Sequence, residues 1–183
     1  MRRTAMVLAV GVLLVALSAG SALALAIYGT LGDDTFRGTK GSDEFYGKSG
    51  DDWIGGRGGN DALFGNGGRD LVYGGPGADR ISGGPGDDQG TAILWALSGG
   101  PGNDLVSGDG GDDYIVGDSG RDILKGGPGD DHIASTTGES YDAPNSTDKI
   151  YCGTGFDTVY ADPADKIADD CEIVRFPNAK DGR

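Results

Sequence analysis

Residues 108–134 read GDGGDDYIV, GDSGRDILK and GGPGDDHIA, which are three copies of one nine-residue unit. Each unit opens with a glycine, has a second glycine three residues later and an aspartate two residues after that. A large apolar residue follows two positions beyond the aspartate. The glycines and the aspartate keep this spacing in eleven units from Gly29 to Ala134, and the apolar residue is present in all but the seventh, which has Gly90. This period is therefore the strongest indication of the fold.

The repeated positions predict a turn followed by a strand. Two glycines in the first six residues suit a tight turn, because glycine adopts backbone angles that other residues avoid. The last three residues can form a short strand whose apolar middle residue faces one side. Such a strand buries little, so units must stack, two to a coil. We therefore expect an all-β protein, a right-handed parallel β-roll.

Stacking would place the aspartates of successive coils in rows. Paired strands lie about 4.8 Å apart, so carboxylates in such a row repel one another unless a cation lies between them. Calcium suits this position because it takes six to eight oxygen ligands in irregular geometry. The aspartates expected to bind it are Asp34, Asp43, Asp52, Asp61, Asp70, Asp79, Asp88, Asp104, Asp113, Asp122 and Asp131.

The unit G-G-x-G-x-D-x-U-x, where U is apolar, resembles the RTX or haemolysin-type calcium-binding repeat. The resemblance implies Ca²⁺ ions between stacked turns, held by aspartate side chains and backbone carbonyls. The opening glycines expected to take part are Gly38, Gly47, Gly56, Gly65, Gly74, Gly83, Gly99, Gly108, Gly117 and Gly126.

No catalytic residues are expected. Residues 117–120 read GDSG, as in some serine proteases, but the repeat already explains this segment. The one histidine, His132, follows that segment, whereas the protease histidine precedes its serine. Paired carboxylates such as Asp112 and Asp113 are explained more simply as calcium ligands.

The first 26 residues have the pattern of a secretory signal peptide. Two arginines precede an apolar run over residues 5–17 and small residues over 18–26. Ala24-Leu25-Ala26 fits an A-x-A cleavage site, and residues 22–24 offer a second one. The alternative is an uncleaved anchor, for which the apolar run is short. We expect cleavage and a secreted, extracellular protein.

The charge of the chain narrows the range of partners. It carries 29 acidic and 15 basic side chains, a net charge of −14, and cleavage would remove Arg2 and Arg3 as well. This excess of negative charge argues against nucleic acid and anionic lipid. It fits a chain that binds divalent cations and is loosely ordered without them.

The repeats are interrupted once and followed by a different tail. The expected repeat domain, residues 27–134, contains an insertion loop at 89–96, after which Leu97 restores the apolar position. Trp95 lies in this loop, which either forms an apolar contact site or folds back onto the roll. Residues 135–183 contain degenerate repeats and are expected to cap the roll.

The tail contains both cysteines, Cys152 and Cys171. An exported chain with a single pair usually oxidises it, so we expect a disulfide that fastens the cap. Free thiols and a metal-binding pair are the alternatives.

Several aromatic side chains occupy outward strand positions. They are Tyr46, Trp53, Phe64, Tyr73 and Tyr114. Isolated surface aromatics need no special explanation. The leading hypothesis is therefore a non-enzymatic calcium-binding structural or interaction module. The alternative is an accessory or adhesin module that binds a glycan or protein through the Trp53/Tyr73 face or the Trp95 loop.

Overall fold

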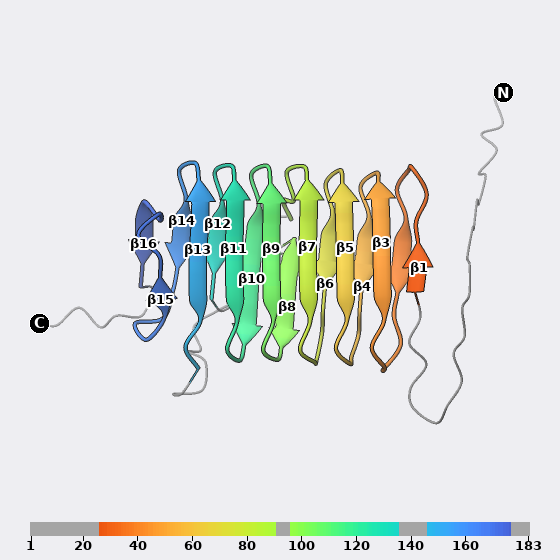
Figure 1. Ribbon diagram of the computed structural model, residues 1–183, viewed down its shortest axis with the longest axis horizontal. Coiled ribbons are helices and arrows are strands. Elements are labelled where there is room, and N and C mark those ends of the chain that lie inside the picture. The colour runs from red at the N-terminus through yellow and green to blue at the C-terminus, as the bar shows by residue number, and fades with distance from the viewer. Residues whose placement is uncertain (1–25, 91–95, 136–145, 177–183) are drawn as a thin grey trace, which may run out of the picture.

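The structure, a computed structural model, describes residues 26–90, 96–135 and 146–176. These residues form two eight-stranded sheets, one of odd-numbered and one of even-numbered strands, in which neighbouring strands are parallel (Figure 1). The described residues contain no helix, and hence none that could span a membrane. The predicted all-β roll is confirmed. Trp95 and residues 1–25, which make up nearly all of the predicted signal peptide, lie outside the described residues.

The chain alternates between the two sheets along its whole described length. The odd sheet contains β1 (Ala26–Tyr28), β3 (Glu44–Ser49), β5 (Ala62–Gly67), β7 (Arg80–Pro85), β9 (Leu105–Gly110), β11 (Ile123–Pro128), β13 (Lys149–Thr154) and β15 (Lys166–Ile167). The even sheet contains β2 (Thr35–Arg37), β4 (Trp53–Gly55), β6 (Leu71–Tyr73), β8 (Leu97–Pro101), β10 (Tyr114–Ser119), β12 (His132–Ala134), β14 (Thr158–Tyr160) and β16 (Ile173–Arg175). Each coil therefore contributes one strand to each sheet.

The nine-residue period sets the register of both sheets. Phe45 pairs with Leu63, one coil of two units further along, and Ile54 pairs with Val72 in the same way. Val72 then pairs with Leu97 across the insertion, so Leu97 restores the apolar position as expected. The extra residues are thus accommodated between strands and leave the stacking intact.

Many strands are longer than the three residues expected. Strand β3 continues from Glu44 to Ser49, into the next unit, and there Lys48 pairs with Asn66. Backbone bonds between coils extend further into the turns, as from the Gly50 N–H to the Gly67 carbonyl at 2.9 Å. Backbone donors and acceptors need partners wherever they are buried, so stacked turns hydrogen-bond to one another much as strands do.

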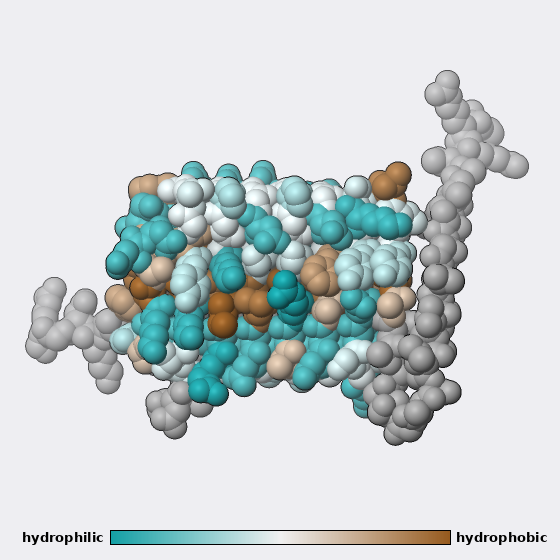
Figure 2. Space-filling view, viewed as in Figure 1, coloured by the Kyte–Doolittle hydropathy of each residue, from teal (hydrophilic) through white to brown (hydrophobic). Residues whose placement is uncertain are grey.

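The core is a single layer of apolar side chains between the sheets. Each interior strand places one large side chain in it: Phe45, Ile54, Leu63, Val72, Ile81, Leu97, Val106, Ile115, Leu124, Ile133, Ile150 and Val159. Burial of one such side chain contributes about 1.5–3 kcal/mol. The face shown in Figure 2 is mainly hydrophilic or neutral, with hydrophobic residues gathered in a narrow band along the roll. So thin a core leaves much of the stability to the turns.

The described part of the tail continues both sheets. Strand β13 pairs with β11, and β14 pairs with β12. A disulfide joins Cys152 and Cys171, with an S–S distance of 2.02 Å, as predicted. Asp170 lies close to both sulfurs, but a disulfide has no thiolate with which to bind a metal, so the metal-pair alternative is excluded.

Candidate metal centres in the turns

The turns form two rows, one along each edge of the sheets. We name each turn by its closing aspartate, so the Asp52 turn is residues 47–52. Turns that lead into the even sheet form the Asp52 row, and turns that lead into the odd sheet form the Asp61 row. The predicted aspartates therefore stack as expected, but in two separate rows.

One carboxylate oxygen of each interior aspartate joins neighbouring coils. The Asp52 N–H donates to Asp70 Oδ1 at 2.8 Å, and the Asp61 N–H donates to Asp79 Oδ1 at 2.7 Å. The ladder crosses the insertion, since the Asp79 N–H donates to Asp104 Oδ1 at 2.7 Å. These bonds fix the orientation of each carboxylate and thereby the direction of its second oxygen.

That second oxygen is buried and has no hydrogen-bond partner within the described ranges. The Oδ2 atoms in this position belong to Asp52, Asp61, Asp70, Asp79, Asp88, Asp104, Asp113, Asp131 and Asp157. Buried polar atoms are nearly always hydrogen-bonded, and a buried carboxylate needs a positive partner. The two rows thus present regularly spaced oxygens that require a cation or a proton.

The opening glycine keeps space free beside each of these oxygens except Asp157 Oδ2, whose turn opens with Cys152. A Cβ built on Gly65 would overlap Asp70 Oδ2 and lie 2.8 Å from the Gly83 carbonyl oxygen. A Cβ on Gly74 would overlap Asp79 Oδ2 and lie 2.5 Å from the carbonyl oxygen of Gly99. The carboxylate of one turn and the opening carbonyl of the next coil therefore converge on one space. These are the two ligand types expected from the sequence.

Burial raises the pKa of several of these carboxyl groups. Desolvation raises the pKa of Asp88 and that of Asp113 to about 8, and that of Asp79 to about 7, from 3.8. The backbone N–H bonds lower these pKa values and the neighbouring aspartates raise them further. Ionised carboxylates are therefore disfavoured here unless a cation compensates for them.

Comparison with known proteins agrees with this geometry. A family model for the RTX calcium-binding nonapeptide repeat (4 copies) matches residues 28–63, 55–89 and 98–133. The chain belongs to the RTX calcium-binding repeat family. The family binds calcium through stacked turns, as a structural and non-enzymatic module, and its repeats are typical of secreted bacterial proteins. No curated protein and no solved structure gives a significant match to the chain.

The donor set of the RTX turns suits that ion. Carboxylate and carbonyl oxygens are the ligands that Ca²⁺ prefers, and it tolerates irregular geometry. Asp70 Oδ2 and the Gly83 carbonyl illustrate one such pair, and the space that a Cβ would fill lies between them. The residues present therefore fit the calcium that the family implies.

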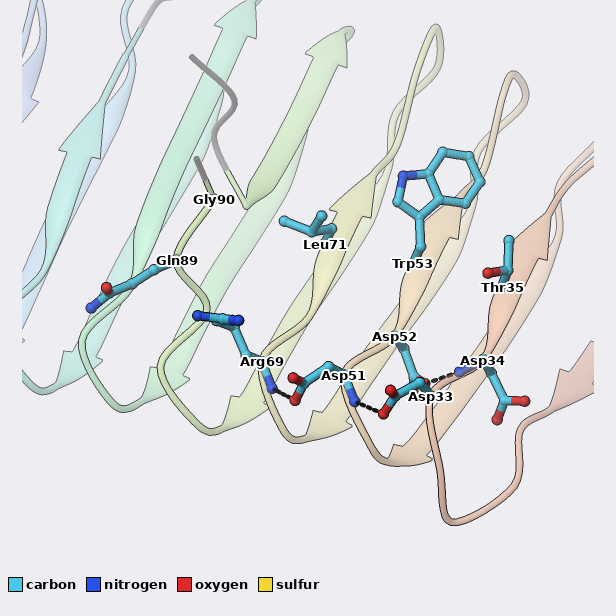
Figure 3. A pocket seen from close by; sticks show the side chains of 10 residues that line it. All are labelled: Asp33, Asp34, Thr35, Asp51, Asp52, Trp53, Arg69, Leu71, Gln89 and Gly90. Atoms are coloured by element: carbon cyan, nitrogen blue, oxygen red, sulfur yellow. Dashed lines mark hydrogen bonds between the residues drawn. The ribbon is translucent and has the colours of Figure 1, made fainter. Parts of the chain in front are cut away.

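A second row of side chains lies outside the Asp52 row and was not predicted. The Asp51 N–H donates to Asp33 Oδ1, and the Arg69 N–H donates to Asp51 Oδ1, both at 2.9 Å (Figure 3). These side chains accept from the next coil, whereas the closing aspartates accept from the preceding one. In the Asp61 row Ser42 and Asn60 have this role without charge. The Asp52 row is thus the more acidic of the two.

The geometry of the rows also continues into the tail, where the sequence analysis expected degenerate repeats but named no ligands. The carbonyl oxygen of Ser135 lies 3.0 Å from a Cβ built on Gly117, and that of Cys152 lies 2.5 Å from one on Gly126. Both replace an opening glycine, and a carbonyl ligand leaves no mark in the side-chain pattern. Asp157 follows Gly155 by two residues, so the repeat pattern marks it as a closing aspartate. In the structure its Oδ1 accepts the Asp131 N–H at 2.8 Å.

The first two turns differ from the others. Asp34 and Asp43 belong to the predicted ligand set, but their Oδ2 atoms already accept hydrogen bonds from Thr30 and Thr39. The structure therefore places these aspartates in the rows with an Oδ2 that already has hydrogen-bond partners.

Proposed function

We propose that the interior turns bind a row of calcium ions along each edge of the roll. Each ion would be held by closing aspartates, from Asp52 onward, and by the opening glycine carbonyl of the following coil. The observation that carries this proposal is the repeated pairing of a buried, unpartnered Oδ2 with that carbonyl, as at Asp79 and Gly99. Repetition at many turns indicates an array of sites rather than a single one.

We further propose that these ions couple folding to extracellular calcium. A thin core and closely stacked carboxylates favour an expanded chain when no cation screens them. Binding that is confined to the folded state stabilises that state. The proposed organisation is a signal peptide at 1–26, a calcium-binding roll at 27–134 with its insertion at 89–96, and a cap and tail at 135–183. The secreted protein would act as a structural or interaction module without enzymatic activity.

Calorimetric titration with CaCl₂ tests the proposal. We expect several bound ions in the wild type and fewer in Asp79→Asn, which removes a charge and an anionic ligand but keeps the shape of the side chain. Asp169→Asn is the matched control, since Asp169 is exposed and lies outside both rows. Equal calcium binding by wild type and Asp79→Asn would contradict the assignment.

A second candidate function is binding of a glycan or protein on the even sheet. Trp53 packs against Tyr73, with ring centroids 6.3 Å apart. Trp53 and Leu71 also line a groove with the polar side chains of Arg69 and Gln89 (Figure 3). Apolar surface with a few polar groups is typical of binding sites. A glycan array probed with and without calcium tests this function, and unchanged binding in Trp53→Ala would exclude this face.

A further inference from the structure

The first two turns have a threonine where later turns have a residue with left-handed backbone. In the interior this second position is held by residues such as Asn66, with φ of 71°, and Gly84, with φ of 109°. Thr30 and Thr39 are not among the described residues with positive φ. A β-branched side chain strongly disfavours that conformation, so the sequence itself prescribes a different turn here.

Each threonine donates hydrogen bonds to Oδ2 of the closing aspartate, the atom that has no hydrogen-bond partner among the described residues in most interior turns. The Thr39 N–H donates to Asp43 Oδ2 at 2.6 Å, and the Thr39 hydroxyl donates to the same atom at 3.0 Å. Thr30 makes the same two bonds to Asp34 Oδ2, at 2.6 and 3.0 Å. Two donors from one residue thus satisfy an oxygen that elsewhere requires a cation.

Other bonds hold these turns closed. Thr39 Oγ1 accepts the Gly41 N–H at 3.0 Å, and Thr30 Oγ1 accepts the Gly32 N–H at 3.2 Å. The guanidinium of Arg57, from the next coil, donates to the Gly38 carbonyl at 3.4 Å and brings a positive charge to the Asp43 turn. The side chains of the chain itself therefore supply what an ion supplies to an interior turn.

We propose that threonine, not calcium, closes the Asp34 and Asp43 turns. The first coil is then a calcium-independent end cap, and the ions begin at the Asp52 and Asp61 turns. This inference rests on the proposed calcium binding of the interior turns. It gives the N-terminal coil, whose outer edge meets no further coil among the described residues, a way to close by itself.

Native mass spectrometry at saturating calcium tests the inference by counting bound ions. Asp43→Asn and Asp61→Asn are matched substitutions in consecutive turns of the same row. We expect Asp43→Asn to keep the wild-type number of ions and Asp61→Asn to lose at least one. Equal loss of ions in the two variants would overturn the proposed calcium-independent end cap but not the proposed function. A wild type that binds no calcium would overturn both proposals.

Substitutions of Thr39 test the cause of the difference. Thr39→Gly gives the Asp43 turn the residue type found at this position in several interior turns, so we expect one ion more than in the wild type. Thr39→Val keeps the β-branch but removes the hydroxyl, so we expect the wild-type number of ions and a lower melting temperature. An unchanged ion number in Thr39→Gly would contradict the proposal that threonine excludes calcium.

Discussion

The two ends of the roll differ chemically from its middle. In the first coil Thr39 holds the second oxygen of Asp43. In the middle the corresponding oxygen of Asp70 is buried beside a carbonyl and has no hydrogen-bond partner among the described residues. At the other end a disulfide between Cys152 and Cys171 fastens the last coils.

The difference shows that one repeat can serve two purposes. The closing aspartate orients the turn through Oδ1 in every interior coil, and this function needs no ion. In our proposal, the second residue of the turn decides whether the turn also needs calcium. A solenoid can thus have ends that fold on their own and a middle whose order depends on calcium.

The disulfide gives the largest expected effect and tests the C-terminal end. Opening it releases a loop with a sequence separation of 19, so reduction should lower the free energy of unfolding by about 3 kcal/mol. Denaturant unfolding in saturating calcium, with and without reductant, measures this change. Cys171→Ser is the control, since its stability should not respond to reductant. Identical curves for oxidised and fully reduced wild type would show that the last coils hold without the bridge.

Glycine substitutions test whether the middle of the roll needs the space beside its buried oxygens. Gly65→Ala places a methyl group against Asp70 Oδ2 and near the Gly83 carbonyl. We therefore expect the free energy of unfolding to fall by about 1–3 kcal/mol and calcium binding at this turn to weaken. Gly32→Ala, at the second glycine of the first turn, is the control for a methyl group that is tolerated, because a Cβ there meets nothing within 4 Å. Thermal unfolding in calcium measures both changes in stability, and equal destabilisation would show that the methyl group at position 65 does not act through Asp70 Oδ2 and the Gly83 carbonyl.

Aspartate substitutions test whether the closing aspartate of an interior turn matters more for calcium-dependent folding than that of the first turn. Asp61→Ala removes a ligand from the Asp61 turn and the acceptor of the Asp43 N–H, so it should raise the calcium concentration needed for half-maximal folding several-fold. Asp34→Ala removes only the acceptor for Thr30 at the edge and should change that midpoint little. Circular dichroism during calcium titration gives both midpoints. Equal shifts would argue against an ion-free first coil.

The effect of pH is expected to concern the interior turns. Asp88 and Asp113 have pKa values near 8 in the folded roll, against 3.8 for an ordinary aspartate, so the folded state without calcium keeps protons that the unfolded chain releases. Its stability should therefore fall as the pH rises from about 4 to about 8. Calcium must displace these protons, so its binding should tighten from pH 6 to pH 8. A titration midpoint that does not depend on pH would contradict the burial of these carboxylates.

The sequence predicted the fold because its period determines the register. A constant spacing aligns Phe45 with Leu63 without any knowledge of the tertiary structure, and Leu97 could be placed across the insertion by the same rule. The length of the strands was predicted less well, because backbone bonds between stacked turns leave no trace in the side-chain pattern.

The site was predicted where it depends on side chains at fixed spacing. The aspartates were placed correctly in rows, whereas the carbonyls of Ser135 and Cys152 were missed because any residue can supply a carbonyl. Thr30 and Thr39 were also missed. Their turns match the repeat at both glycines and the aspartate, and only the hydrogen bonds to the second oxygen reveal that they differ.

Circular dichroism with and without calcium tests the central claim most directly. Excess chelator removes the ions from every interior turn at once, leaving stacked carboxylates around a thin core. We predict that chelation abolishes most of the β-sheet signal and that millimolar calcium restores it. An unchanged spectrum and an unchanged melting temperature in chelator would contradict the proposal that calcium holds the middle of the roll together.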